Sequence, residues 1–307
     1  MEAGELDAEF EALERAVDTY ARTWWVGPDS PVSEFLQNHP DVRPRLNDRL
    51  VRGLPVSTAD VYASRTLRDW DADRVPVHLE ILDGLDADDA AALEHATTDS
   101  DTGATLPHED EGSAAGDVYF VLGLPGSGKT RVLRRVASAH AAAQHLPASD
   151  ADDVRVRFPE YHDGQGSGVV QVETVVVTYG QHHLVDQGRE DRVLARGGHA
   201  IVDVIGDPHI LPVTLALLSR AGRRCFLLLT DCPPDVCKDR AKRRAVETGR
   251  LVPMSVIESK VGVPGEALDA ALVTGLVAGW AVIDTSGDEP RIIDGDGTFD
   301  ELLDGLG

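Results

Sequence analysis

Lysine is scarce in this chain. Only four of its 307 residues are Lys, and 53 acidic against 29 basic side chains leave a formal net charge of −24. Phosphate backbones and anionic lipid repel so acidic a protein, so we expect neither a nucleic-acid partner nor a membrane partner. Any polyphosphate ligand must then bind where positive charge is locally concentrated.

Long apolar runs and a disulfide framework are also missing. No run of about 18 apolar residues occurs, and four carboxylates lie in the first ten residues, where a signal peptide would be basic and then apolar. The three cysteines, Cys225, Cys232 and Cys237, are too few to form a disulfide framework. These features predict a cytoplasmic protein, and its 42% of hydrophobic residues can supply a sizeable core.

The acidic charge is concentrated in the first third of the chain. Residues 1–116 contain 26 acids and nine arginines, a net charge of −17, whereas residues 117–307 contain 27 acids and 20 basic residues, a net charge of −7. At the junction, residues 99–116 are small, polar and acidic. That composition buries too little apolar surface to order itself, so we predict a flexible linker over 99–116.

The part before the linker has the pattern of a small helical domain. Apolar and aromatic residues recur at helical spacing over residues 6–25, 32–36, 56–70 and 77–85. Aromatic side chains at such spacing belong to a packed core far more often than to a cofactor site. We predict an acidic helical domain over residues 1–98, in which no catalytic motif is visible.

The part after the linker alternates short apolar runs with helical or turn segments. The apolar runs cover residues 118–122, 200–205, 225–230 and 281–284. Such runs are typical of strands buried on both faces of a parallel sheet, so we predict an α/β domain over 117–307. Residues 169–179 are rich in β-branched side chains and on that ground favour a further strand.

A phosphate-binding loop follows the first of these strands. The sequence GLPGSGKT comprises Gly123, Leu124, Pro125, Gly126, Ser127, Gly128, Lys129 and Thr130. It matches G-x-x-x-x-G-K-[ST] in the required order of strand, loop and helix. The glycines let the backbone aim its N–H groups at phosphate oxygens, Lys129 reaches the outer phosphates, and Thr130 offers a hydroxyl to Mg²⁺. The loop predicts binding of a nucleoside triphosphate such as ATP.

Two acidic positions lie where they would complete such a site. Asp203 ends an apolar strand run, where its carboxylate either reaches the metal shell or serves only as a structural cap. Asp150 and Asp152 follow the helix after the loop, at the expected carboxyl edge of the second strand. A carboxylate there can accept a proton from a substrate hydroxyl, although such a cluster is also typical of a solvated loop.

The densest positive cluster of the chain follows two prolines at 233 and 234. Its members are Lys238, Arg240, Lys242, Arg243, Arg244 and Arg250. A mobile helical lid that places arginines on the transferring phosphate explains the cluster, and so does a salt-bridged surface helix.

Together these residues resemble the zeta toxin family of P-loop kinases. The matching features are the GLPGSGKT loop, the Asp-x-Asp at 150–152 before a Pro-x-Tyr segment, the strand acid Asp203, and the Arg-rich stretch ending at Arg250. The resemblance implies a nucleotide-kinase-like α/β fold that phosphorylates a hydroxyl of a sugar nucleotide such as UDP-N-acetylglucosamine, with ATP and Mg²⁺. It also implies a helix over 169–179, so helix and strand both remain open there.

The resemblance assigns roles to single residues. It makes Asp152 the candidate base, preferred over Asp150 for its spacing to the Pro-x-Tyr segment. It places Lys129, Arg250 and either Arg243 or Arg244 on the phosphates, and it makes Thr130 and Asp203 the metal ligands. The chain departs from the family pattern at Asp207, where a basic residue is common.

The resemblance also bears on partners. Toxins of this family are held inactive by small helical antitoxins, which implies an antitoxin partner or an N-terminal domain that covers the ATP site in cis. Two other functions stay open from the residues alone. One is a kinase of an antibiotic or another metabolite, and the other is a regulatory P-loop NTPase that docks on a partner and hydrolyses ATP slowly.

Overall fold

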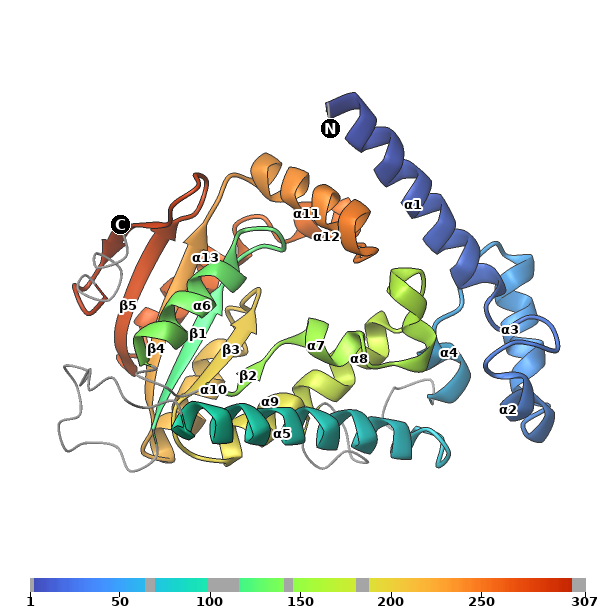
Figure 1. The fold of residues 1–307 in the computed structure, drawn as a ribbon, viewed down its shortest axis with the longest axis horizontal. Coiled ribbons are helices and arrows are strands. Elements are labelled where there is room, and N and C mark those ends of the chain that lie inside the picture. The colour runs from blue at the N-terminus through green and yellow to red at the C-terminus, as the bar shows by residue number, and fades with distance from the viewer. Residues whose placement is uncertain (1–2, 64–69, 99–115, 141–145, 181–187, 300–307) are drawn as a thin grey trace. The chain divides into compact units, whose positions relative to one another are not determined.

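The computed structural model describes residues 3–63, 70–98, 116–140, 146–180 and 188–299. Contacts divide the chain into two compact units, each assembled from segments that are distant in the sequence (Figure 1). Unit 1 contains residues 1–85, 151–191 and 242–251. Unit 2 contains residues 86–150, 192–241 and 252–307.

Unit 2 is built on a six-stranded sheet with the strand order β2-β3-β1-β4-β5-β6. Its strands are β1 (Asp117–Leu122), β2 (Ala148–Ser149), β3 (Ala200–Val204), β4 (Arg224–Asp231), β5 (Val277–Asp284) and β6 (Arg291–Gly295). All neighbouring pairs are parallel except β5 with β6. The predicted α/β class is confirmed, and the strand expected directly before Asp150 is present as the short β2, whereas the antiparallel β6 was not predicted.

Helices cover both faces of this sheet. Those lying wholly or partly in unit 2 are α5 (Val75–Thr98), α6 (Lys129–His140), α9 (Arg189–Ala195), α10 (Leu211–Arg220), α11 (Pro234–Thr248), α12 (Met254–Ser259) and α13 (Val263–Leu272). Side chains alternate along a strand. Val118, Phe120 and Leu122 of β1 therefore pack in one core with α10 and α13, while Tyr119 and Val121 pack in the opposite core with α6. All of β1 is buried, which explains its unbroken apolar run.

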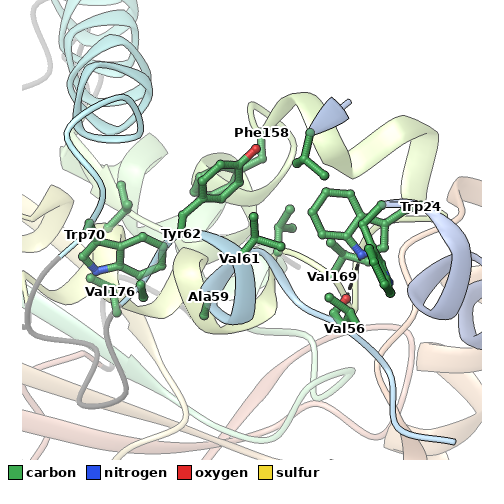
Figure 2. Close-up of a cluster of buried hydrophobic side chains, with 14 of the residues drawn as sticks. Trp24, Val56, Ala59, Val61, Tyr62, Trp70, Phe158, Val169 and Val176 are labelled. Carbon is green, nitrogen blue, oxygen red and sulfur yellow. Dashed lines mark hydrogen bonds between the residues drawn. The ribbon is translucent and has the colours of Figure 1, made fainter. Parts of the chain in front are cut away.

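Unit 1 is helical. It contains α1 (Ala3–Thr23), α2 (Ser33–Asn38), α3 (Val42–Val51), α4 (Thr58–Tyr62), α7 (Ala151–Arg155), the 3-10 helix η1 (Pro159–Gly164) and α8 (Gln171–Tyr179), with parts of α5, α9 and α11. A single buried core joins Trp24 and Val56 of the N-terminal segment to Phe158, Val169 and Val176 of the later one (Figure 2). The indole of Trp24 also donates to the Val56 carbonyl at 2.8 Å. The N-terminal helices thus share one core with the segment that carries Asp152.

The N-terminal third of the chain differs in part from what its sequence predicted. The helix predicted over 56–70 is wrong in part, because α4 ends at Tyr62 and Ala63 instead forms an antiparallel bridge with Trp70. The predicted linker lies outside the described residues except at Gly116. The division into domains 1–98 and 117–307 concerns independent folding, which contacts do not test, so it stays a prediction.

Among the described residues, no helix has both the length and the apolar character needed to cross a bilayer.

The strand favoured by the β-branched residues of 169–179 is wrong, because Gln171–Tyr179 forms α8. Its buried residues include Glu173, Thr174, Val177 and Thr178, which recur at helical spacing. The two threonine hydroxyls donate to the carbonyl four residues earlier, at 2.9 and 2.7 Å, which satisfies them inside the core. Burial against the N-terminal helices has overridden an intrinsic preference that is small to begin with.

A buried ionic cluster ties the N-terminal segment to the later segment of unit 1. Arg74 donates from Nε and Nη2 to Glu173 at 2.6 and 2.9 Å, and from Nη1 and Nη2 to Glu160 at 2.9 and 2.8 Å. His78 Nε2 lies 2.5 Å from Glu173 Oε1. Burial alone would raise the pKa of Glu173, but the hydrogen bond to His78 and the charge of Arg74 outweigh it and lower this pKa to about 2. Glu173 is therefore ionised at neutral pH and depends on its cationic partners.

Replacing Arg74 by Met tests the importance of this cluster. The substitution keeps much of the side-chain volume but leaves Glu160 and Glu173 buried without their cation, so we expect a loss of about 3–5 kcal/mol in the free energy of unfolding. Urea titration followed by circular dichroism measures this loss. Arg15→Met is the control, because Arg15 pairs with Glu11 at 3.6 Å while 69% of its side chain is exposed, and about 0.5 kcal/mol or less is expected there. Equal losses in both variants would contradict a special role for Arg74.

Candidate functional site

The glycine-rich loop leaves β1 after Leu122, and α6 begins at Lys129. Gly126 and Gly128 have φ angles of 81° and 89°, a region that side-chain-bearing residues rarely adopt. A Cβ on Gly126 would also lie 2.3 Å from the carbonyl oxygen of Cys237. The loop therefore requires glycine at Gly126 both for its backbone conformation and for its close approach to α11.

Hydroxyl groups at the ends of two strands fix the loop from behind. Thr230 on β4 donates to the Leu122 carbonyl at 3.0 Å, so the 2.6 Å contact between Ser127 Oγ and Thr230 Oγ1 has Ser127 as its donor. Thr285, directly after β5, donates to the Ser127 carbonyl at 2.5 Å. Arg240 in turn donates to the Thr285 carbonyl at 2.7 Å. These supports were not predicted from the sequence, although the threonines that end the run 225–230 and follow the run 281–284 were a visible signal.

Lys129 and Asp203 lie together at this end of the sheet. The ammonium of Lys129 donates to the carbonyls of Gly123 and Leu124 at 3.0 and 3.1 Å and lies 3.6 Å from Asp203 Oδ1. Both side chains are only 12% exposed. Asp203 is on β3 in register with Val121 of β1, so its carboxylate lies near the carboxyl ends of the two strands. Thr130 is exposed in the first turn of α6.

Asp152 lies in unit 1, on the short helix α7. Its Oδ1 is 3.1 Å from Nη1 of Arg155, and its other carboxylate oxygen forms an ion pair with Arg250. About a quarter of the Asp152 and Arg250 side chains is exposed, at 23% and 24%. Two guanidinium groups therefore orient this carboxylate. Asp150, the alternative base, directly follows β2 and belongs to unit 2.

The basic cluster of α11 is divided between several partners. Lys238 pairs with Glu258 at 2.9 Å in unit 2, and Lys242 pairs with Asp7 of α1 at 2.6 Å in unit 1. Arg240 binds backbone carbonyls near the loop, as described above. The alternative interpretation, a salt-bridged surface helix, therefore explains Lys238 and Lys242. Arg243 is exposed and Arg244 half-buried, and their contact with phosphates stays a prediction.

The predicted site residues fall into two groups by unit. Unit 2 contains Gly123–Thr130 and Asp203, a set that combines backbone N–H groups, one ammonium and two oxygen donors. Such a set suits a triphosphate and a hard divalent cation. Unit 1 contains Asp152, Arg243, Arg244 and Arg250, a set of one carboxylate and three guanidinium groups. That set suits a hydroxyl acceptor and the negative charge of a phosphoryl group.

Solved structures of low sequence identity share the fold. A chain of AvrRxo1-ORF1:-ORF2 with ATP has a TM-score of 0.54 at 15% identity, covering 82% of this chain and 81% of that chain. The corresponding complex with sulphate ions has a TM-score of 0.52 at 15% identity, covering 82% of both chains. A chain of the PezAT chromosomal toxin–antitoxin system of the human pathogen Streptococcus pneumoniae is 14% identical, covers 76% of this chain and 88% of that chain, and has a TM-score of 0.49.

The comparison with curated proteins gives no match. The family model described as zeta toxin matches residues 107–294, well over half of the chain. This range includes the phosphate-binding loop and the positions of Asp152, Asp203 and Arg250. The resemblance seen in the sequence is thereby confirmed, and the chain belongs to the zeta toxin family, whose members are ATP-dependent kinases.

Proposed function

We propose that this kinase transfers the γ-phosphoryl group of ATP to a hydroxyl of a sugar nucleotide such as UDP-N-acetylglucosamine, and that it is the toxin of a toxin–antitoxin system. The observation that carries the proposal is the placement of Lys129 over the glycine-rich loop, 3.6 Å from Asp203, at the carboxyl ends of adjacent parallel strands. Ligands of open α/β sheets bind at this edge. Membership of the zeta toxin family favours phosphorylation of a small molecule over a regulatory switch.

On the donor side, backbone N–H groups of the loop would bind the phosphate oxygens, and Lys129 would bridge the outer phosphates. The Thr130 hydroxyl and the Asp203 carboxylate are oxygen donors of the kind Mg²⁺ prefers, and Asp203 is largely withdrawn from solvent beside a cation. These two residues therefore fit a magnesium site. When bound, Mg²⁺ neutralises charge on the β- and γ-phosphates.

On the acceptor side, we assign the base to Asp152. Arg155 and Arg250 fix the direction of its carboxylate, which would accept the proton of the attacking hydroxyl. Phosphoryl transfer depends mainly on positioning and on charge neutralisation, so an oriented carboxylate flanked by arginines suits the reaction. Arg250 with Arg243 or Arg244 would stabilise the charge on the transferred group. The anionic diphosphate of a sugar nucleotide is a natural ligand for the same arginines.

An antitoxin on a separate chain is our preferred inhibitor. Lys242 on α11 makes the contacts that speak for inhibition in cis. It forms an ion pair with Asp7 of α1, whose side chain is 56% exposed, and lies over the Phe10 ring, 6.0 Å from its centroid. Together these contacts contribute about 2 kcal/mol at most. A 100-fold suppression of activity needs about 2.8 kcal/mol. Since the N-terminal helices also share the core of unit 1, we infer that their main role is structural.

The proposed compartment is the cytoplasm. The phosphoryl donor is ATP, and the three cysteines are buried and free, which fits a reducing environment.

The acceptor is identified by mass spectrometry of reactions with ATP and Mg²⁺. We expect the full-length protein to add one phosphate, about 80 Da, to a sugar nucleotide in a panel that includes UDP-N-acetylglucosamine, aminoglycosides and common metabolites. Lys129→Ala, which removes the cation from the loop, should abolish the product. Phosphorylation of another panel member alone would replace the proposed acceptor. ATP hydrolysis without any phosphorylated acceptor would favour the regulatory NTPase.

Asp203→Asn tests the magnesium site. Removing the carboxylate charge should raise the Mg²⁺ concentration for half-maximal activity by about tenfold or more, because a hard cation binds a neutral amide oxygen less tightly than a carboxylate. The measurement is initial rate against free Mg²⁺ at saturating ATP. Asp231→Asn is a matched control, since Asp231 ends β4, which lies on the other side of β1 from β3. An unchanged Mg²⁺ dependence in Asp203→Asn would mean that Asp203 is only a structural partner of Lys129.

A further inference from the structure

Helix α10 of unit 2 is apolar on two sides. Leu211, Leu215 and Leu218 are buried in the core beneath it. On the solvent side, Ile210, which directly precedes the helix, Val213 and Leu217 are 57%, 59% and 59% exposed. These three side chains follow one another at spacings of three and four residues, so they form one continuous apolar stripe, hereafter the α10 stripe. Scattered exposed aliphatic residues are normal, but three on one helix face offer a surface against which another helix can pack.

The α10 stripe is also unusual in its charge. From Pro208 to Thr230 the sequence contains no acidic residue, although 53 acids are present in the chain. The charged residues that flank the stripe in the sequence are Asp207, before the helix, and the exposed Arg220 in its last turn. Backbone hydrogen bonds from His209 and Ile210 hold the pKa of Asp207 below its usual range, so this carboxylate is ionised. The net charge of −24 over the whole chain makes two copies repel each other outside this uncharged stretch.

The α10 stripe is self-complementary: its residues match those of a second copy of the helix that runs in the opposite direction. A twofold axis between Val213 and Thr214 places Ile210 of one copy opposite Leu217 of the other. The same axis places Asp207 opposite Arg220, an acid against a base. Symmetric dimers use one surface patch twice, which requires this kind of internal reversal. A partner of another sequence would not require it.

We propose that the α10 stripe is the contact surface between two copies of this chain, packed as antiparallel helices about a twofold axis near Val213 and Thr214. The helix α13, which contacts α10, carries the exposed acids Glu266 and Asp269. Three exposed side chains make a small apolar area, so the dimer is a concentration-dependent one. Asp207, where the chain departs from the family pattern, has its place in this contact and not in the phosphate site.

Sedimentation of the full-length protein between about 1 and about 200 µM tests the proposal, since weak interfaces dissociate in this range. We expect the wild type to approach the dimer mass at the high end and Leu217→Asp to remain a monomer throughout. Val273→Asp is the matched control, because Val273 belongs to the same unit, is 88% exposed and lies outside the stripe. This variant should dimerise like the wild type. A wild type that stays monomeric, or a Val273→Asp variant that dissociates equally, overturns the proposal.

Cysteine crosslinking tests the antiparallel geometry independently of affinity. Val213→Cys lies next to the proposed axis and should form an interchain disulfide under mild oxidation. Ser219→Cys, exposed on the same helix, would lie about 16 Å from its counterpart along the helix axis at 1.5 Å per residue and should not crosslink. The native cysteines are buried, which keeps the background low. Equal crosslinking of both variants, or crosslinking of Ser219→Cys alone, contradicts the twofold axis.

Discussion

One buried guanidinium group holds unit 1 together. Arg74 serves two carboxylates at once, Glu160 and Glu173, which follow it in the chain by 86 and 99 residues. Two buried carboxyl groups, of which Glu173 is ionised, would be very unfavourable in an apolar core without that cation. The N-terminal helices therefore fold against the segment that carries Asp152. The position of the candidate base depends on a residue of the N-terminal segment, although the sequence there contains no catalytic motif.

The glycine-rich loop and the proposed acceptor-side residues are held in place by different interactions. Around the glycine-rich loop, Thr230 and Thr285 hold the backbone from behind with neutral hydrogen bonds. These supports bind the Ser127 hydroxyl and carbonyl and not its N–H group, and Lys129 is the loop's concentrated positive charge. Around Asp152, orientation comes from ion pairs with Arg155 and Arg250. A charge of −24 over the chain is compatible with polyphosphate binding because positive charge is concentrated in these few places.

The sequence was most informative where local pattern and tertiary environment agree. The run 118–122 is apolar because β1 is covered on both faces, and the GLPGSGKT motif needs only its own strand and helix. Prediction failed where distant contacts decide. The β-branched residues of α8 favoured a strand, and only burial against helices far away in the sequence makes them helical. Arg74, Arg240 and Thr285 act through partners that no local spacing reveals. Arg240 was noted only as a member of the basic cluster, and Arg74 and Thr285 were not predicted to have a role.

The central claim is that Asp152 acts on the acceptor while the glycine-rich loop binds ATP. Asp152→Asn separates the two roles, measured as the acceptor phosphorylation rate and the ATP dissociation constant of the same variant. Asp150→Asn is the matched control, two residues away. The account predicts that Asp152→Asn loses about 10²–10⁴-fold in rate, the usual contribution of a general base, with ATP affinity unchanged. A rate within a few-fold of the wild type, or a loss found instead in Asp150→Asn, would contradict it.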